Sequence, residues 1–521
     1  MKSLPLFAAA LLTTGAATAQ NNTQSVTTSG TDNSVTIMQT GTNNSLRASV
    51  TGDFNRAAGT QNGTANRSAQ TVNSTYGSAT VSQTGSSNQA GQSLSSGAGS
   101  SVLITQVGAV NSANQVHAGG QGTALTISQT GTGNQGTQQQ TGSAFGSTVS
   151  IAQTGTNNYS SQQHTGSSVS LRTAATQMGS NNFAVQNQSG SFNGVLATVY
   201  QDGRYNSATQ NQSGETNGVI SQLGEGNRAS QQQSGSFRLG PSNGTIDQTG
   251  TRNRASQEQS LGTASATQNG TDNLITQTQR TTFGSNAQAA QTGNNNTLTQ
   301  SQQAEFGLVA RATQMGSGNG GTQTQTGLGG TSATLDQNGQ RNNATQRQER
   351  GEATVAATQT GNDNRVSQVQ VTAFVSTATV QQTGNVHQAS QSQNGQDLVA
   401  TITQTGGGHA ASQVQTGAQN EAIIEQRGNS NSASQTQSSL GGADVSRVTV
   451  LQSGFGQQAI QVQNGGRDNQ ALIDQSGLNN YARQEQSGEL NSVSTYQGLS
   501  GNRSEVVQAG SDNVLVIRQN R

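Results

Sequence analysis

The chain contains no cysteine and only two prolines, Pro5 and Pro241, among its 521 residues. Without cysteine, a folded state has to be stable without disulfide bonds. Proline lacks a backbone N–H, so hydrogen-bonded β-ladders exclude it, whereas a disordered linker has no reason to do so. The shortage of proline therefore favours an ordered β-structure over the alternative that the composition also allows, a disordered Gln- and Asn-rich chain.

Apolar, aromatic and charged side chains are also scarce. Hydrophobic residues make up 28% of the chain and aromatic residues 3%, and the mean hydropathy is −0.64. This composition argues against several globular domains with separate hydrophobic cores. The formal net charge is zero, Lys2 is the only lysine and no basic stripe is visible, so nucleic-acid binding is not supported. Beyond the N-terminus, no apolar run is long enough to predict a membrane span.

The N-terminus has the pattern of a secretory signal peptide, which we predict over residues 1–19. Lys2 gives a short basic start, residues 4–12 are apolar, and Ala17-Thr-Ala19 has the small residues of a cleavage site. We expect the mature chain to start near Gln20 with a polar lead-in over residues 20–32.

One phrase, Gln-x-Gly-x-x-Asn, recurs along nearly the whole chain. It reads Gln39-Thr-Gly41-Thr-Asn-Asn44 near the start and is still present at Gln475. Most steps between successive phrases are 22 to 24 residues long, and a repeat of this period indicates a solenoid, a propeller or an array. The first glutamines of the series are at positions 39, 61, 83, 106, 129, 153, 177 and 201.

Each repeat consists of two similar halves, because a second glutamine follows about half a period later, as Gln188 follows Gln177. In the first half, apolar residues alternate with polar ones, as Val149 and Ile151 do before Gln153, which is typical of a strand with one buried face. The second half reads Asn-x-Ala-x-Gln-x-Gln. We therefore predict an all-β fold over residues 33–521: a parallel β-solenoid of about 21 strand-turn-strand-turn rungs with amyloid-like cross-β stacking.

Glycine permits a positive φ at no steric cost, so the glycine of each phrase is expected to form a turn. A Gln or Asn amide carries two N–H donors and an acceptor oxygen, so stacked amides can donate to one neighbouring rung and accept from the other. The expected turn glycines are Gly41, Gly85, Gly179, Gly203, Gly293, Gly361 and Gly477. The expected ladder residues are Gln39, Asn44, Gln83, Asn88, Gln106, Asn111, Gln177, Asn182, Gln188, Gln201, Asn206, Gln212, Gln291, Asn296, Gln359, Asn364, Gln475 and Asn480.

The second turn of each repeat is where the repeat length is expected to vary, and Pro241 lies in one lengthened turn. Several aromatic residues lie four residues after a glutamine of the second strand. They are interpreted either as turn filler or as a surface stripe along one edge. These residues are Phe192, Phe237, Phe283 and Phe374.

This pattern resembles the curlin repeat of bacterial curli fibres, Ser-x5-Gln-x-Gly-x2-Asn-x-Ala-x3-Gln. Gln177, Gly179, Asn182, Ala184 and Gln188 match its last five positions. The resemblance covers nearly all of the mature chain. It implies secretion in an unfolded form through an outer-membrane export channel, and assembly with itself and with other curlin-like subunits into extracellular amyloid fibres. Such fibres serve cell adhesion and form biofilm matrix.

The chain departs from the family pattern at three points. The serine position is loose, with Gly77 before Gln83. The first two repeats carry Val50 and Val72 in place of the final glutamine. The number of repeats also exceeds the handful found in typical curlins.

The sequence predicts no catalytic, cofactor or metal site. No nucleophile elbow or calcium-binding repeat occurs, and acidic residues do not pair at a fixed spacing. His117 and His164 are scattered, whereas His387 and His409 occupy Asn positions of the phrase and are interpreted as substituted ladder residues.

Two classes of function remain: an amyloid-forming fibre subunit, or a monomeric β-solenoid such as a surface adhesin or an ice binder. Ice binding requires rows of Thr-x-Thr in register, and the Thr-x-Thr segments at 276–278 and 322–324 are not expected to be in register. A capped monomer is expected to carry a blocking terminal repeat. Residues 514–517 instead form an apolar segment, which favours the fibre subunit.

Overall fold

The computed structural model describes residues 21–95, 98–143, 145–167, 169–190, 194–236, 241–281, 284–327, 329–439 and 445–519. The predicted signal peptide lies outside these residues. Every element in the described ranges is a β-strand, and the chain divides into two units, residues 1–261 and 262–521. No helix in this part of the chain is long and apolar enough to cross a membrane.

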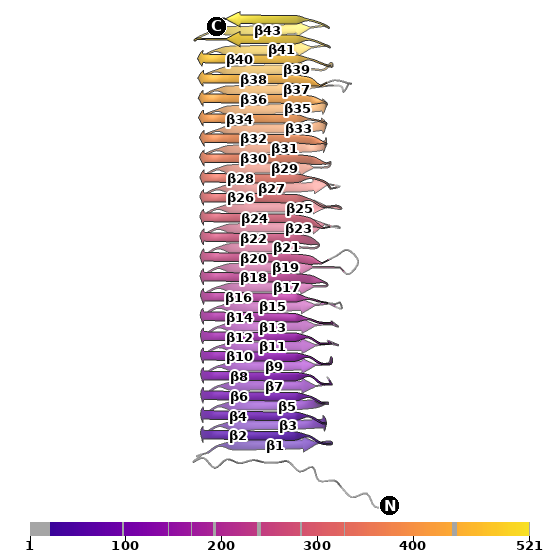
Figure 1. Ribbon diagram of the computed structural model, residues 1–521, viewed down its shortest axis with the longest axis vertical. Coiled ribbons are helices and arrows are strands. Elements are labelled where there is room, and N and C mark those ends of the chain that lie inside the picture. Colours follow the sequence, from indigo (N-terminus) through magenta and orange to yellow (C-terminus); the bar gives the residue numbers. More distant parts are fainter. Residues whose placement is uncertain are drawn as a thin grey trace, which may run out of the picture. The chain divides into compact units, whose positions relative to one another are not determined.

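In the first unit, the even-numbered strands form one parallel ladder and the odd-numbered strands form another (Figure 1). The even-numbered strands are β2 (Ser34–Thr42), β4 (Arg56–Thr64), β6 (Ser78–Ser86), β8 (Ser101–Ala109), β10 (Ala124–Thr132), β12 (Thr148–Thr156), β14 (Arg172–Ser180), β16 (Leu196–Arg204), β18 (Thr216–Glu225) and β20 (Ser242–Thr251). The odd-numbered strands are β1 (Thr23–Ser29), β3 (Ser45–Asp53), β5 (Arg67–Thr75), β7 (Gln89–Ser95), β9 (Ser112–Ala118), β11 (Gln135–Thr141), β13 (Tyr159–Thr165), β15 (Phe183–Ser189), β17 (Ser207–Ser213), β19 (Arg228–Ser234) and β21 (Arg254–Gln259).

The second unit has the same arrangement. Its even-numbered strands are β22 (Gly262–Thr271), β24 (Ser285–Asn294), β26 (Val309–Ser317), β28 (Ser332–Gln340), β30 (Ala353–Asn362), β32 (Ser376–Asn385), β34 (Val399–Gly407), β36 (Asn420–Asn429), β38 (Ser446–Phe455), β40 (Gln470–Leu478), β42 (Ser492–Gln497) and β44 (Val514–Gln519). Its odd-numbered strands are β23 (Leu274–Thr281), β25 (Thr297–Ala304), β27 (Gly320–Gly327), β29 (Asn343–Glu349), β31 (Arg365–Phe374), β33 (Gln388–Gln396), β35 (Ala410–Ala418), β37 (Ser432–Ser438), β39 (Gln458–Asn464), β41 (Tyr481–Ser487) and β43 (Arg503–Ala509).

One even-numbered strand and the odd-numbered strand after it make one rung, and rungs stack in chain order within each unit. Even-numbered and odd-numbered strands point in opposite directions (Figure 1). The stacking places each residue on its counterpart in the next rung: Gln129 of β10 pairs with Gln106 of β8 below and with Gln153 of β12 above. The prediction of a parallel β-solenoid of about 21 turns is confirmed.

The core is the narrow space between the two ladders, filled from the inward faces of both. Even-numbered strands contribute residues such as Val102 and Ile104, and odd-numbered strands contribute small residues such as Ala184 and Ala208, all at most 1% exposed. One rung buries too little apolar surface to be stable alone at roughly 25 cal/mol per Å². Stability therefore has to accumulate along the stack, as it does in other repeat proteins.

The first unit has its most apolar interior in its earliest rungs. Val50, Val72 and Leu94 stack directly on one another at the position that holds glutamine in most later rungs. They belong to one buried cluster with Leu46 and Val35. At Val50 and Val72, where the sequence departs from the repeat, stacked apolar side chains thus replace the amide ladder.

The solenoid begins earlier than the sequence predicted. Residues 20–32 were expected to be a polar lead-in, but Thr23–Ser29 form β1, which pairs in parallel with β3. Asn22 makes the same contacts as later asparagines: its amide donates to Gly41 O (3.0 Å) and its Oδ1 accepts the N–H of Asn44 (2.9 Å). The sequence did contain one indication of this strand: Asn22 lies one repeat length before Asn44.

Variation in repeat length is confined to the turns, and the longest intervals follow odd-numbered strands, as predicted. Pro241 is exposed at the end of one such turn, and Phe374 is also exposed. Phe192, Phe237 and Phe283 lie outside the described residues, so both interpretations of the aromatic residues, turn filler and surface stripe, stay predictions.

The expectation that the Thr-x-Thr segments are out of register is wrong. Thr276 of β23 lies on Thr299 of β25, which lies on Thr322 of β27. Thr278 and Thr324 stand in a neighbouring column with Ser301 between them. The turns absorb the differences in repeat length, so strands two rungs apart keep their register.

Candidate functional site: the amide ladders

The glutamine of each Gln-x-Gly-x-x-Asn phrase is buried and links its rung to two neighbours. In β6, Gln83 Nε2 donates to Gln106 Oε1 of the next even-numbered strand (2.8 Å) and to the backbone carbonyl of Arg67 in the opposite ladder (3.0 Å). Both N–H groups of the amide are thereby used, which removes the cost of burying it. The same amide-to-amide bond is made by Gln39, Gln106, Gln177, Gln201, Gln291, Gln359 and Gln475.

The odd-numbered strands add two further ladders. Gln188 and Gln212 form the predicted one, with Gln188 Nε2 donating to Gln212 Oε1 (3.2 Å). The other runs through the preceding inward residue, where Gln186 Nε2 donates to Gln210 Oε1 (2.8 Å) and to Ala174 O (3.2 Å). This middle ladder was not among the candidate residues, although its signal was present in the pattern Asn-x-Ala-x-Gln-x-Gln.

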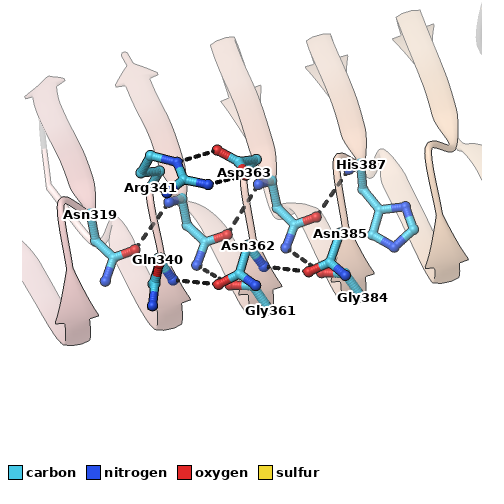
Figure 2. Close-up of polar contacts among 11 residues, drawn as sticks. Asn319, Gln340, Arg341, Gly361, Asn362, Asp363, Gly384, Asn385 and His387 are labelled. Carbon is cyan, nitrogen blue, oxygen red and sulfur yellow. Dashed lines mark hydrogen bonds and ion pairs between the residues drawn. The ribbon is translucent and has the colours of Figure 1, made fainter.

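The asparagine column is built differently from the expected amide-to-amide ladder (Figure 2). Asn342 Oδ1 accepts the backbone N–H of Asn364 in the next rung (3.1 Å), and Asn342 Nδ2 donates to the carbonyl of Gly361 (2.8 Å). Asparagine is one methylene shorter than glutamine, so its amide stays close to the chain and binds backbone groups. The predicted members Asn44, Asn88, Asn111, Asn182, Asn206, Asn296, Asn364 and Asn480 are all buried.

Some steps of this column add an amide-to-amide bond, as from Asn88 Nδ2 to Asn66 Oδ1 (3.1 Å). The backbone contacts nevertheless recur more regularly. The asparagines therefore fasten the turn of one rung to the turn of the next.

The turn glycines have the predicted positive φ, and the stacking gives a second reason for glycine. All seven candidates have φ between 99° and 121°. A Cβ added at Gly293 would lie 1.9 Å from the carbonyl oxygen of Gly316 in the next rung. These glycines therefore allow both the turn and the close approach of successive turns, whose carbonyls accept the asparagine amides.

An exposed set of contacts lies outside this column (Figure 2). Arg341 forms two hydrogen bonds of 2.7 Å with Asp363 in the next rung, and this guanidinium holds the pKa of the Asp363 carboxyl below its usual range. Exposed ion pairs of this kind stabilise a fold only weakly. The buried column therefore contributes more to holding these rungs together than the exposed ion pair does.

His387 and His409 take the place of two successive asparagines and reproduce their hydrogen bonds. His387 Nδ1 accepts the N–H of His409 (3.3 Å), and His409 Nδ1 accepts the N–H of Asn431 (3.2 Å). On the other side of each ring, Nε2 lies 3.1 Å and 3.0 Å from the carbonyls of Thr383 and Thr405. These contacts require the neutral tautomer with its proton on Nε2. The two rings stack with centroids 5.0 Å apart.

Gln457 occupies the same column but replaces asparagine incompletely. Its Nε2 donates to Ser453 O and to Gly477 O (3.2 Å), as an asparagine amide would. Its Oε1 is buried and has no hydrogen-bond partner among the described residues. The extra methylene moves the oxygen out of reach of the next backbone N–H, at Asn480.

The last inward position of each odd-numbered strand, which Gln188 occupies in β15, is not a continuous amide ladder between β9 and β13. His117 is fully buried, and burial lowers its pKa to about 4, while its Nε2 lies 3.2 Å from Ser100 Oγ. On the next rung, within the part of the chain described, neither amide atom of Gln140 has a hydrogen-bond partner. This column is therefore the weakest of the amide ladders.

The ladders have a direction, because their amide-to-amide bonds run from a glutamine Nε2 to the Oε1 of the next rung toward the C-terminus. At the N-terminal edge of the described chain, Gln39 Oε1 is consequently buried without a donor. At the C-terminal edge, Gln519 accepts from Gln497 (2.7 Å) and donates to Arg503 O (3.0 Å), which leaves its second N–H for a further acceptor.

Comparison with known proteins gives no match: no protein-family model fits the chain, and no curated protein is significantly similar to it in sequence. Within the described ranges, no three His, Cys, Asp or Glu residues gather to hold a metal ion. The most regular polar feature of the described residues is the directional set of buried amides.

Replacing Gln291 by leucine should lower the stability of the second unit modestly. The change removes the donor to Gln314 Oε1 and the acceptor for Gln268, and an unsatisfied buried polar group costs roughly 1–3 kcal/mol. The midpoint of denaturant unfolding measures the effect. Thr292→Leu, one residue away on the exposed face, is the matched control. An equal loss of stability in both variants would show that the inward ladder is not what matters.

Acidification should loosen the rungs around His387 and His409. Burial is the main cause that lowers the pKa of both groups below the ordinary value of 6.5. The unfolded chain then binds protons more readily, so stability is complete above about pH 6.5 and decreases as the pH falls toward the folded pKa. A protonated Nδ1 also cannot accept an N–H.

Hydrogen exchange at the backbone amides of His409 and Asn431, compared between pH 7.5 and pH 5, measures this loosening after correction for intrinsic exchange. The double variant His387→Asn/His409→Asn restores the amide contacts and should remove the pH dependence. If it keeps the wild-type pH dependence, the histidine pair is not its origin.

Gln457→Asn should stabilise the second unit. The shorter side chain places its oxygen where other asparagines accept the N–H of the next rung, and this satisfies a buried acceptor. We expect slower exchange of the Asn480 amide and a higher denaturant midpoint. Gln461→Asn, which shortens a glutamine already in a complete ladder, is the opposite control and should lower the midpoint.

Proposed function

We propose that this chain is a secreted, amyloid-forming subunit of curli-like extracellular fibres that support cell adhesion and biofilm matrix. The resemblance of its repeat to the curlin repeat supports this assignment, and so does a solenoid whose buried amides bond from rung to rung. The observation that carries the proposal is that the two edges of the described chain are complementary. Copies then grow end to end.

The two edges are complementary in shape. β1 is half a rung, since it lies in the odd-numbered ladder with no even-numbered strand at its own level among the described residues. β44 is the other half, since it extends the even-numbered ladder one step beyond β43. When β44 of one copy meets β1 of another, the two half-rungs complete one rung.

The edges also match in their inward residues. Leu515 and Ile517 precede Gln519 as Val35 and Ile37 precede Gln39, so stacking places apolar residues on apolar residues. Gln519 then supplies the N–H that Gln39 Oε1 lacks. At the C-terminal edge, the inward Leu515 is 39% exposed, whereas its counterpart Val493 one rung below is 1% exposed, so no described segment covers this edge. An edge of this kind templates further pairing.

The backbone of β44 presents free groups to an incoming copy. The N–H of Ser492 donates to Asn513 O (2.7 Å), so the backbone groups of Asn513 face β42. Along a strand these groups alternate in direction. Those of Val514 and Val516 therefore face away from β42, toward the next copy.

Val516→Pro should act as a chain terminator. It removes an N–H that faces the next copy but none that bonds to β42, and the Val516 side chain points outward, so the core keeps its composition. We expect this variant to add to wild-type seeds and to arrest their elongation even when it is the minor species. Val516→Thr keeps the N–H and should elongate at the wild-type rate.

Elongation of Val516→Pro at the wild-type rate would show that β44 is not a growing edge. Wild-type protein that stays folded and monomeric at high concentration for days would contradict the fibre proposal itself. That outcome would favour the alternative, a monomeric β-solenoid adhesin.

A further inference from the structure

A long stretch of the first unit carries no acidic or basic side chain. Residues 68–171 contain no Asp, Glu, Lys or Arg, and their two histidines, His117 and His164, are buried. The second unit differs sharply, because it presents outward ion pairs such as Arg427–Glu425 and Arg447–Glu421. Charges on exposed β-surfaces keep such surfaces apart. Strands β6 to β12 lack this protection.

The outer face of the even-numbered strands β4 to β14 is correspondingly free of charge in its three central columns. Three outward columns cross it, and almost all their side chains are short. They are Ala58, Thr80, Leu103, Thr126, Ser150 and Ala174; Thr60, Ser82, Thr105, Ser128, Ala152 and Thr176; and Asn62, Thr84, Val107, Thr130, Thr154 and Met178. The nearest charges, Arg56 and Arg172, stand at the first residues of the two outermost strands. We call this surface the neutral face.

We propose that the neutral face packs against the neutral face of a second copy, side by side, so that fibres bundle. Two sheets meet at about 10 Å in such packing. Short uncharged side chains can interdigitate there without burying a charge. Serine and threonine hydroxyls both donate and accept, so they find partners in either orientation. Leu103 and Val107 are 37% and 43% exposed and supply apolar contact near the centre.

The area of the neutral face indicates that it can hold fibres together but not a single pair of copies. Six strands spaced at about 4.8 Å, each contributing about 20 Å of length, give about 600 Å² per copy. The total of about 1,200 Å² is at the low end of specific protein interfaces. A single pair of copies is therefore held weakly. In a fibre the face recurs once per copy, and these contacts act together, so fibres associate although monomers do not.

The opposite face of the same rungs is less suited to this packing. Its outward columns hold larger side chains, including the stacked rings of Tyr159 and Phe183. A shallow hollow of about 340 Å³, lined partly by Arg67 and Gln89, interrupts it. A flat partner would leave this hollow unfilled.

Ser82→Glu/Ser128→Glu tests the proposal by placing two carboxylates on the neutral face, on either side of Thr105. We expect seeded elongation at the wild-type rate, single rather than bundled fibres in electron micrographs, and several-fold lower turbidity. Bundling should return near 1 M salt, where charges are screened within about 3 Å. The matched control is Thr358→Glu/Thr403→Glu, at the same outward column of the second unit on either side of Gln381. It should bundle like the wild type.

This inference rests on the proposed fibre, and the two readouts separate the two claims. Undiminished bundling by Ser82→Glu/Ser128→Glu, or equal loss of bundling by both double variants, would overturn the neutral face while elongation leaves the fibre proposal standing. A wild-type chain that forms no fibres would contradict the fibre proposal, and the lateral contact would fall with it.

Discussion

The rest of this structure depends on the hydrogen bond between a buried amide and the same amide one rung away. The space between the two ladders is too thin to hold a conventional core, and much of what fills it is polar. A buried amide without partners costs several kcal/mol in an apolar environment. Here each rung supplies the partners for the next, so an arrangement that would be unfavourable in one rung becomes favourable in a stack. A slip of one residue would turn every amide outward, so the ladders also lock the register.

The same bonds give the stack its polarity. A glutamine amide that donates toward the C-terminal neighbour leaves an acceptor open at one end and a donor open at the other, as at Gln39 and Gln519. Adding rungs moves these open groups without removing them. A solenoid of this kind therefore cannot satisfy itself internally, unlike a closed barrel. The backbone is incomplete in the same way, because β1 and β44 are each half of a rung among the described residues. The self-association proposed above would supply the missing partners at both edges of the described chain.

The sequence was sufficient to predict the rung, the register and the turn glycines, because residue type and spacing recur together. Periodicity shows which residues stack but not which atoms bond, so the backbone contacts of the asparagine column were missed. The strand at Thr23–Ser29 was missed because its inward residues are mostly polar, and only Asn22 marked it. The threonine register was misjudged because it depends on how the turns absorb length. The failure of Gln457 as a substitute depends on one methylene, which no pattern of polar residues reveals.

The departures from the repeat indicate that an inward substitution is tolerated when the residues stacked on it in neighbouring rungs are substituted as well. Removing one partner of a buried hydrogen bond leaves the other unsatisfied, whereas replacing both by apolar groups of similar shape can be nearly neutral. Val50, Val72 and Leu94 follow this rule, because they occupy consecutive rungs and pack on one another. His387 and His409 are likewise adjacent, so one neutral ring serves the next. Gln140 shows the opposite case: with His117 below it, its amide meets no matching amide, and its atoms stay unsatisfied. A repeat protein of this type can therefore change its interior gradually only where neighbouring rungs change together.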